Sequence, residues 1–272
     1  MDGYQTSGLV SGIMLPVIVA SIMFIAEYVY RASKDVSLRF ISVIDYTAQS
    51  TDGVIIISQD PSSANPIQLG TSVNERTGIE FAFSFFLMVK DSTFNGVDEL
   101  KHVFHRGYRS PWPLMCPGVF IKGDTNTMRV IVNTNTNPYK YADVTNIPLN
   151  KWFHVVLNCY NSGLDIYINS NLAHRIPFKN EVIYQNFQDL IVFSPNITTI
   201  NNTITRSAGD SMIRFNGPAT GSLSSLKYAR YALSIKEIKT LMNSGPSSAM
   251  KTMTTDSNTG YLSDTWWSEQ QN

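Results

Sequence analysis

The chain has 272 residues, and its 21 basic and 21 acidic residues give a formal net charge of zero. Because this balance leaves no broad basic field, the composition disfavours a nucleic-acid partner. The two cysteines, Cys116 and Cys159, are too few for the disulfide framework of a small secreted domain. We expect buried free thiols, since Cys159 extends the apolar side of a predicted strand. A Cys116–Cys159 bridge is the alternative.

The first predicted element is an apolar segment, Gly8 to Tyr30, that is long enough to cross a bilayer. A helix rises about 1.5 Å per residue, so this length covers a hydrocarbon thickness of ~30 Å. A cleaved signal peptide, the alternative, would carry a basic region before a shorter apolar stretch. Only Asp2 is charged before this segment. We therefore expect residues 1–40 to be a retained membrane anchor with a basic flank, with anchor residues Gly8, Leu15, Pro16, Val19, Phe24, Tyr28, Tyr30 and Arg31.

Basic residues follow the apolar segment and do not precede it: Arg31, Lys34 and Arg39. Lysine and arginine near a span favour the cytoplasmic side. The predicted topology therefore has a short N-terminus outside and the large C-terminal part on the cytoplasmic face. A lipid bilayer is the first expected partner.

The residues after the anchor alternate with the period of two that is typical of strands. Every odd position from Ile79 to Val89 is apolar, which predicts that Phe83 faces a core and Ser84 the opposite side. A β-hairpin is predicted from Trp152 to Ile168, with its turn at residues 161–163. Further strands are predicted at Val54–Ser58, His102–Arg106, Gly118–Ile121, Met128–Val132, Asp189–Phe193 and Ser222–Tyr231.

Many short strands between turn-forming loops predict an all-β jelly-roll sandwich over residues 41–246. One short helix is predicted near the C-terminus, because Ser234 and Glu237 form a capping box and Gly245 with a following proline ends the apolar periodicity. Residues 247–272 read as a polar C-terminal tail. Its Trp266 and Trp267 either dock on a partner or pack back on the domain.

The order of the strand segments is more specific than any one of them. The segments that carry it are Phe81–Lys90, Lys101–Gly107, Cys116–Ile121, Ile147–Leu157, Leu164–Ala173 and Gly221–Ile238. This series resembles concanavalin A-like (laminin G-like) jelly rolls. It is most similar to those encoded by large nucleocytoplasmic DNA viruses (giant viruses), in which one transmembrane helix often precedes the jelly roll. The resemblance implies a virion component. The polar segment from Asn196 to Asp210, interpreted as a loop, departs from the relatives.

The sequence lacks the acidic pattern that catalysis in this superfamily uses. Its glucanases carry Glu-x-Asp-x-x-Glu on one strand, and retaining hydrolysis needs two carboxyl groups ~5 Å apart. No such pattern occurs, and Asp165 is interpreted as a solvated strand residue. We expect a protein that is not an enzyme and has no cofactor. Calcium bound by loop carboxylates is the alternative, with candidates Asp124, Asp143 and Asp210.

The histidines also give little indication of a metal-binding site. His102 and His105 are three residues apart in a predicted strand, and an odd spacing sends two side chains to opposite faces. We therefore expect no histidine metal site. His154 is expected to form a hydrogen bond across its sheet.

The expected function is that of a non-enzymatic structural virion protein, a membrane-anchored minor capsid protein that links the inner viral membrane to the capsid shell. The expected location is the virion, with the host cytoplasmic face during assembly, and the expected partners are the bilayer and capsid or other virion proteins. Residues assigned to partner contact are Arg106, Arg109, Trp112, Trp266 and Trp267. The alternative is a membrane-bound lectin that binds a glycan through Trp112, a residue that would otherwise pack to fix its loop.

Overall fold

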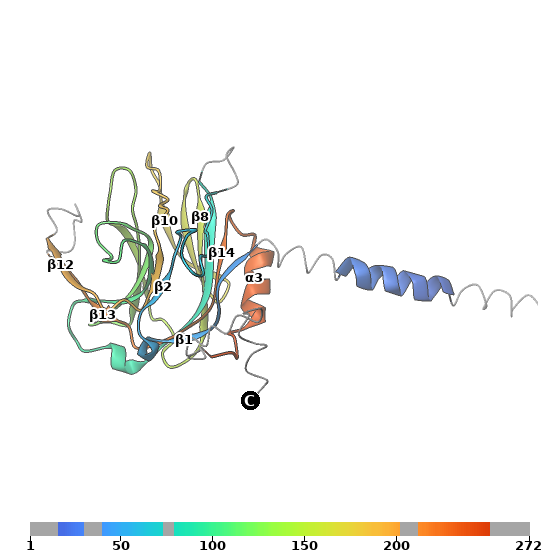
Figure 1. The fold of residues 1–272 in the computed structure, drawn as a ribbon, viewed down its shortest axis with the longest axis horizontal. Helices are drawn as coiled ribbons and strands as arrows, with labels where there is room; N and C mark the ends of the chain where they lie inside the picture. Colours follow the sequence, from blue (N-terminus) through green and yellow to red (C-terminus); the bar gives the residue numbers. More distant parts are fainter. Residues whose placement is uncertain (1–15, 30–39, 73–78, 202–211, 251–272) are drawn as a thin grey trace, which may run out of the picture.

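The computed structural model describes residues 16–29, 40–72, 79–201 and 212–250. Two layers of strands face each other, and one helix covers the outside of one layer (Figure 1). The six-stranded sheet has the order β1 (Ile41–Gln49), β14 (Gly221–Ala229), β3 (Phe81–Val89), β8 (Phe153–Tyr160), β9 (Gly163–Ile168) and β10 (Asn171–Pro177). The expected all-β sandwich is confirmed.

The eight-stranded sheet forms the other layer. Its main path has the order β12 (Ile197–Asn201), β13 (Met212–Pro218), β4 (Leu100–Gly107), β5 (Met115–Lys122), β6 (Thr127–Val132) and β7 (Lys140–Thr145). Outside this path, the short strand β11 (Leu190–Val192) pairs with β4, and β2 (Ile55–Ile57) pairs with β11. Two single turns of 3₁₀ helix, η1 (Ser50–Asp52) and η2 (Asp91–Thr93), complete the connections.

The main core lies between the two sheets and is rich in phenylalanine. Phe83 and Phe85 of β3 both contact Phe104 of β4, with ring centroids 6.0 Å and 5.0 Å away. Such tilted and edge-on pairs add to the free energy gained from burial alone. Cys116 and Cys159 lie in the same core as free thiols, so the prediction of buried, unpaired cysteines is confirmed. Burial raises the pKa of the Cys116 thiol to about 12.

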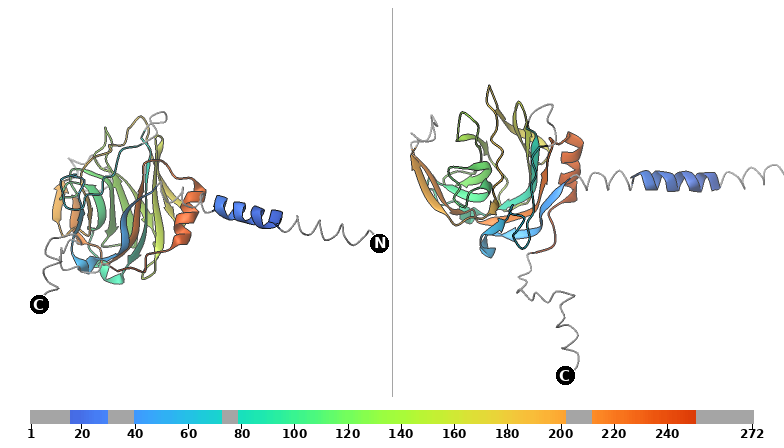
Figure 2. Two further views of the ribbon diagram at one scale, coloured as in Figure 1. Left: turned by 45° about the vertical axis from the view of Figure 1, so that its right-hand side comes forward. Right: turned by 45° about the horizontal axis from the view of Figure 1, so that its top comes forward.

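Helix α3 (Ile235–Ser244) packs on the outer face of the six-stranded sheet (Figure 2). The predicted capping box is present: the Glu237 backbone N–H donates to Ser234 Oγ, and the Ser234 N–H donates to the Glu237 carboxylate. The cluster beneath the helix consists of Ala82, Val156, Tyr167, Ala229, Leu233, Ile238 and Leu241. The cluster covers the second face of β3 at Ala82, and the His154 ring packs on Phe86 of the same face. Strand β3 is therefore buried on both sides, which explains the apolar residues at its even positions.

The predicted strands and the predicted hairpin are all present, but five further strands are not among the predictions. These are β1, β7, β10, β12 and β13. Strand β12 corrects the interpretation of residues 196–210 as a loop, since it pairs antiparallel with β13 from Ile197 to Asn201. Backbone hydrogen bonds hold this pair, and only Ile200 of β12 is buried. The side chains therefore give almost no alternation for a sequence pattern to detect.

Residues 16–29 form an exposed helix that includes Pro16, Val19, Phe24 and Tyr28. In the described part of the chain, no helix combines the length and apolar character that a membrane span requires. The other four anchor residues, Gly8, Leu15, Tyr30 and Arg31, lie outside the described residues.

The chain continues past α3 along strand β1, although the sequence predicts a loose tail from residue 247. The Thr47 N–H donates to the Ala249 carbonyl at 2.7 Å, and Thr47 Oγ1 donates to the Ser247 carbonyl at 2.8 Å. Met250 forms a parallel bridge with Thr47. The first four tail residues are thus part of the domain. Trp266 and Trp267 lie outside the described residues.

Candidate functional site: a loop on the eight-stranded sheet

Residues 108–114, which we call the rim loop, connect β4 to β5 and carry the exposed part of the predicted contact surface. Tyr108 is 49% exposed, and Arg109 is exposed beside it. Trp112 is half-buried and packs on a second apolar cluster: Leu100, Met115, Phe120, Ile131, Tyr139, Ile200, Ile213 and Phe215. Of the two interpretations of Trp112, packing that fixes the loop agrees with this position.

A pair of buried histidines supports the start of the rim loop. His102 Nε2 lies 2.6 Å from His105 Nδ1, and the ring centroids are 4.8 Å apart. The expectation that these rings point to opposite faces is therefore wrong. The physical reason is a β-bulge, because the β4–β5 register skips Val103 between His102 and Phe104. One extra residue restores an even spacing, which places both rings on the same side.

The hydrogen bonds of this pair assign both protons. The Ser194 backbone N–H points at His102 Nδ1 at 2.9 Å, so that nitrogen must accept. Neutral His102 then carries its proton on Nε2 and donates to His105 Nδ1, and His105 Nε2 donates to the Tyr108 carbonyl at 2.7 Å. Burial lowers the pKa of His105 to about 4 and holds the pKa of His102 well below its usual value, with a smaller effect from His105. The chain of donors runs from the Ser194 backbone to the rim loop.

Two asparagines fix the rest of the rim loop. Asn133 Oδ1 accepts from the Met115 N–H at 2.7 Å, and Asn133 Nδ2 donates to the Pro113 carbonyl at 3.2 Å and to the Pro138 carbonyl. Asn196 Nδ2 donates to the Arg109 carbonyl. Backbone groups at both ends of the loop are therefore held by side chains from β4, the residue after β6 and the segment before β12. Tyr108 and Arg109 are thus presented on a fixed backbone.

Arg106, one of the predicted contact residues, is buried and only 2% exposed. Its Nη2 donates to the Leu69 carbonyl at 2.9 Å, and its guanidinium lies 6.0 Å from the centroid of the Tyr228 ring. The assignment of Arg106 to partner contact is corrected: its charge and donors serve the interior of the sandwich. Arg109, three residues later, keeps an exposed side chain.

The acidic residues considered for catalysis or calcium face cations. Asp165 is buried, not solvated as expected, because β10 brings Arg175 opposite it in register. Arg175 Nε lies 3.3 Å from its Oδ1, an ion pair without hydrogen-bond geometry, and burial raises the pKa of the Asp165 carboxyl. Asp143 accepts two hydrogen bonds of 2.7 Å from Arg129, and Asp124 lies 3.4 Å from Lys122. Asp210 lies outside the described residues.

The residues that build the rim loop carried only weak signals in the sequence. Tyr108 directly follows a predicted strand and lies beside the charged Arg109, so local sequence could have indicated that Tyr108 is exposed. Asn133 and Asn196 act through long-range contacts, which no local pattern indicates. No group of three or more histidine, cysteine or acidic side chains with metal-binding geometry occurs within the described ranges.

No protein-family model and no curated protein matches this chain. Among solved structures, it is similar to a Trypanosoma rangeli sialidase in complex with the inhibitor DANA, with 11% identity and a TM-score of 0.40 over 60% of this chain and 22% of that one. It is also similar to the binding domain of botulinum neurotoxin DC in complex with rat synaptotagmin II, with 16% identity and a TM-score of 0.45 over 71% and 40%.

A third similar structure, of botulinum neurotoxin type C, comes from a study of cell entry that depends on two ganglioside molecules. It is 17% identical, with a TM-score of 0.48 over 73% of this chain and 42% of that one. This chain thus spans less than half the length of each of the three structures. At these identities the similarities concern the β-sandwich fold alone.

Proposed function

We propose that this protein is a non-enzymatic structural component of a virion, a membrane-anchored minor capsid protein that works by surface contact. The observation that carries the proposal is the rim loop, where hydrogen bonds from buried side chains hold an exposed tyrosine and arginine on a fixed backbone. Tyrosine and arginine contribute much of the energy of protein interfaces. A loop fixed before binding loses little conformational entropy on contact, which favours affinity.

The connectivity of the chain supports a bridging role. Only residues 31–39 separate the end of the apolar segment from Phe40, which lies beside α3 and β1. Ten backbone steps span at most about 35 Å. If the segment from Gly8 to Tyr30 lies in a bilayer, the six-stranded sheet lies near it, and the eight-stranded sheet with its rim loop forms the other layer (Figure 2). The resemblance of the strand segments to viral jelly rolls is the reason for proposing that the protein is part of a virion.

The experiment compares incorporation of three full-length proteins into particles. The wild type should co-purify with capsids from which detergent has stripped the membrane. A Tyr108→Ala, Arg109→Ala double variant should lose at least tenfold in this association, because both side chains leave the rim loop. Tyr184→Ala removes another exposed aromatic ring outside the loop and serves as the matched control. Association of the double variant at wild-type level would overturn the assignment of the rim loop.

A second candidate, a membrane-bound lectin, draws on the same loop. The exposed Tyr108 ring beside polar loop residues offers a face on which a sugar ring can stack. A glycan array separates the two functions. Calcium-dependent binding of one defined sugar, lost in Tyr108→Ala, would favour the lectin. Co-purification with stripped capsids and no selective sugar binding would favour the structural protein.

A further inference from the structure

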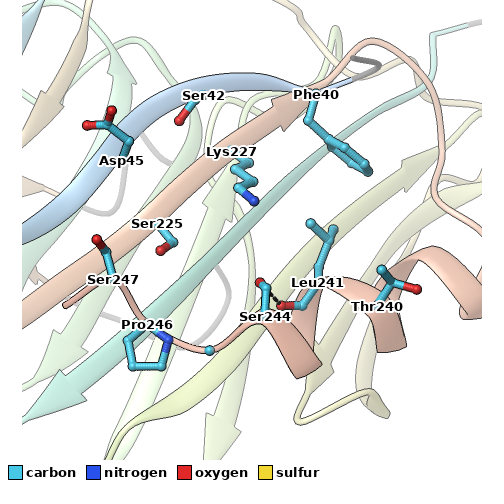
Figure 3. Close-up of a pocket in the computed structure, with 11 residues that line it drawn as sticks. Phe40, Ser42, Asp45, Ser225, Lys227, Thr240, Leu241, Ser244, Pro246 and Ser247 are labelled. Carbon is cyan, nitrogen blue, oxygen red and sulfur yellow. Dashed lines mark hydrogen bonds between the residues drawn. The ribbon is translucent and has the colours of Figure 1, made fainter. Parts of the chain in front are cut away.

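A pocket of about 510 Å³ lies outside the core, between β1, β14 and the C-terminal end of α3 (Figure 3). Its floor is the outer face of the six-stranded sheet, and the chain after α3 closes one end. The lining residues are Phe40, Ser42, Asp45, Ser225, Lys227, Thr240, Leu241, Ser244, Gly245, Pro246 and Ser247. Polar groups on the strands thus face apolar groups from Phe40, Leu241 and Pro246.

Lys227 supplies the positive charge of this pocket. Its side chain projects between Phe40 and Leu241 (Figure 3). Within the described residues its ammonium group has no carboxylate within ion-pair distance and no hydrogen-bond partner. Asp45 belongs to the lining, but its carboxylate points away from Lys227 in Figure 3. The pocket therefore presents a cation that no acidic group of the described residues neutralises.

Two hydroxyl groups flank this cation on adjacent strands. Ser42 lies opposite Lys227 in the β1–β14 register. Ser225 lies in a bulge of β14, where it adopts a positive φ of 52°. Neither hydroxyl has a hydrogen-bond partner among the described residues, whereas Thr240 and Ser244 already donate to carbonyls of α3. One ammonium and two free hydroxyls are the donors that a phosphate group, with its several acceptor oxygens, requires.

The position of the pocket favours a phosphate at a membrane surface. Phe40 belongs to its lining, and at most about 35 Å of chain connects this residue to the end of the proposed anchor. Lipid headgroups would be the phosphate groups nearest to it. The apolar side of the pocket, formed by Phe40, Leu241 and Pro246, suits the carbon atoms next to such a phosphate.

We propose that this pocket binds the phosphate of a lipid headgroup through Lys227, Ser42 and Ser225. The inference rests on the membrane anchor of the proposed function and adds a second, specific attachment to the bilayer. Its effect would be to fix the orientation of the domain on the bilayer, because two points of attachment restrict rotation more than one.

The test uses the full-length protein in a non-ionic detergent that contains no phosphate. Dihexanoyl phosphatidic acid, a short-chain soluble lipid, is titrated in by calorimetry. We expect saturable binding that weakens at least tenfold in Lys227→Gln and by a smaller factor in Ser42→Ala. Lys239→Gln removes an exposed lysine of α3 outside the pocket and should bind like the wild type. Thermal melting of each variant checks that the fold is kept.

Three outcomes would overturn the proposal: no binding, binding unchanged in Lys227→Gln, or equally tight binding of inorganic phosphate, which would indicate a site for free phosphate. A failed anchor gives a different result. In that case a Lys227→Gln protein without residues 1–30, which lacks both the apolar segment and the headgroup contact, still floats with membranes, whatever the result of the titration.

Discussion

His102, His105 and His154 are buried on the outer faces of the two sheets, and none has a carboxylate partner among the described residues. The pKa values of His105 and His154 fall to about 4, chiefly by burial, with a smaller contribution from Lys227 at His154. An unfolded histidine titrates near 6.5. Below that pH the unfolded chain takes up protons that the folded chain does not, so stability is complete above about pH 6.5 and falls as the pH drops toward 4.

We predict that each buried histidine costs about 1.4 kcal/mol of unfolding free energy per pH unit below 6.5. Urea unfolding at pH 7.5 and pH 5.5 measures the total. His154→Gln should reduce the difference between the two pH values. Leu172→Ala, which changes an exposed side chain that binds no proton, should not. An equal unfolding free energy at both pH values would contradict the assignment of three neutral histidines.

Phe83 and Ser84 are neighbours in β3 that face opposite sides, as the alternation predicts, but both are buried. Phe83→Ala should cost about 3–5 kcal/mol through lost transfer free energy and a cavity. Ser84 Oγ lies 2.8 Å from His154 Nε2, and His154 Nδ1 has no hydrogen-bond partner in the part of the chain that the structure describes. Ser84→Ala should therefore cost about 1–3 kcal/mol, because it leaves the ring without any hydrogen bond. Chemical denaturation of both variants measures the two costs; equal costs would contradict this register.

At the level of elements, the rim loop depends on side chains that are distant in sequence. Asn133→Ala removes the acceptor of the Met115 N–H and the donor to the Pro113 carbonyl. We predict that amide hydrogen exchange of residues 108–115 becomes at least tenfold faster, with a loss of stability of about 1–3 kcal/mol.

The matched control is Ser234→Ala, which removes the N-cap of α3 on the other layer. It should cost about 1 kcal/mol and should leave exchange in the rim loop unchanged. If amide exchange in the rim loop is also faster in this control, or is not faster in Asn133→Ala, Asn133 does not hold the loop.

How far the sequence predicts this fold depends on whether a signal is local. The capping box of α3 involves residues three apart, and the strands of the core alternate over several residues, so both were predictable. The β4 bulge was not, because two adjacent apolar residues such as Val103 and Phe104 also occur in a regular strand that is buried on both faces. The single extra residue of the bulge decides whether His102 and His105 meet. Likewise, the burial of Asp165 and Arg106 depends on which segments lie beside their strands.

For the whole molecule, the prediction concerns membrane attachment. Val19→Arg places a charge near the middle of the apolar segment, at a cost of about 2.5–3.5 kcal/mol for insertion. In a Lys227→Gln background, which removes the proposed headgroup contact, we predict that this variant no longer floats with membranes while its thermal unfolding stays unchanged. Val19→Leu keeps the apolar character and serves as the control. Unchanged flotation of Val19→Arg would exclude this segment as the anchor.

Strand β1 is the outermost strand of its sheet, and the short segment from Ser247 to Met250 covers part of its free side. An uncovered outer strand offers unpaired N–H and carbonyl groups to another chain. A protein that ends at Pro246 should therefore self-associate by adding strands, whereas one that ends at Met250 should remain monodisperse in light scattering. The four residues from Ser247 to Met250 would then decide whether this domain remains monomeric or aggregates through the edge of its six-stranded sheet.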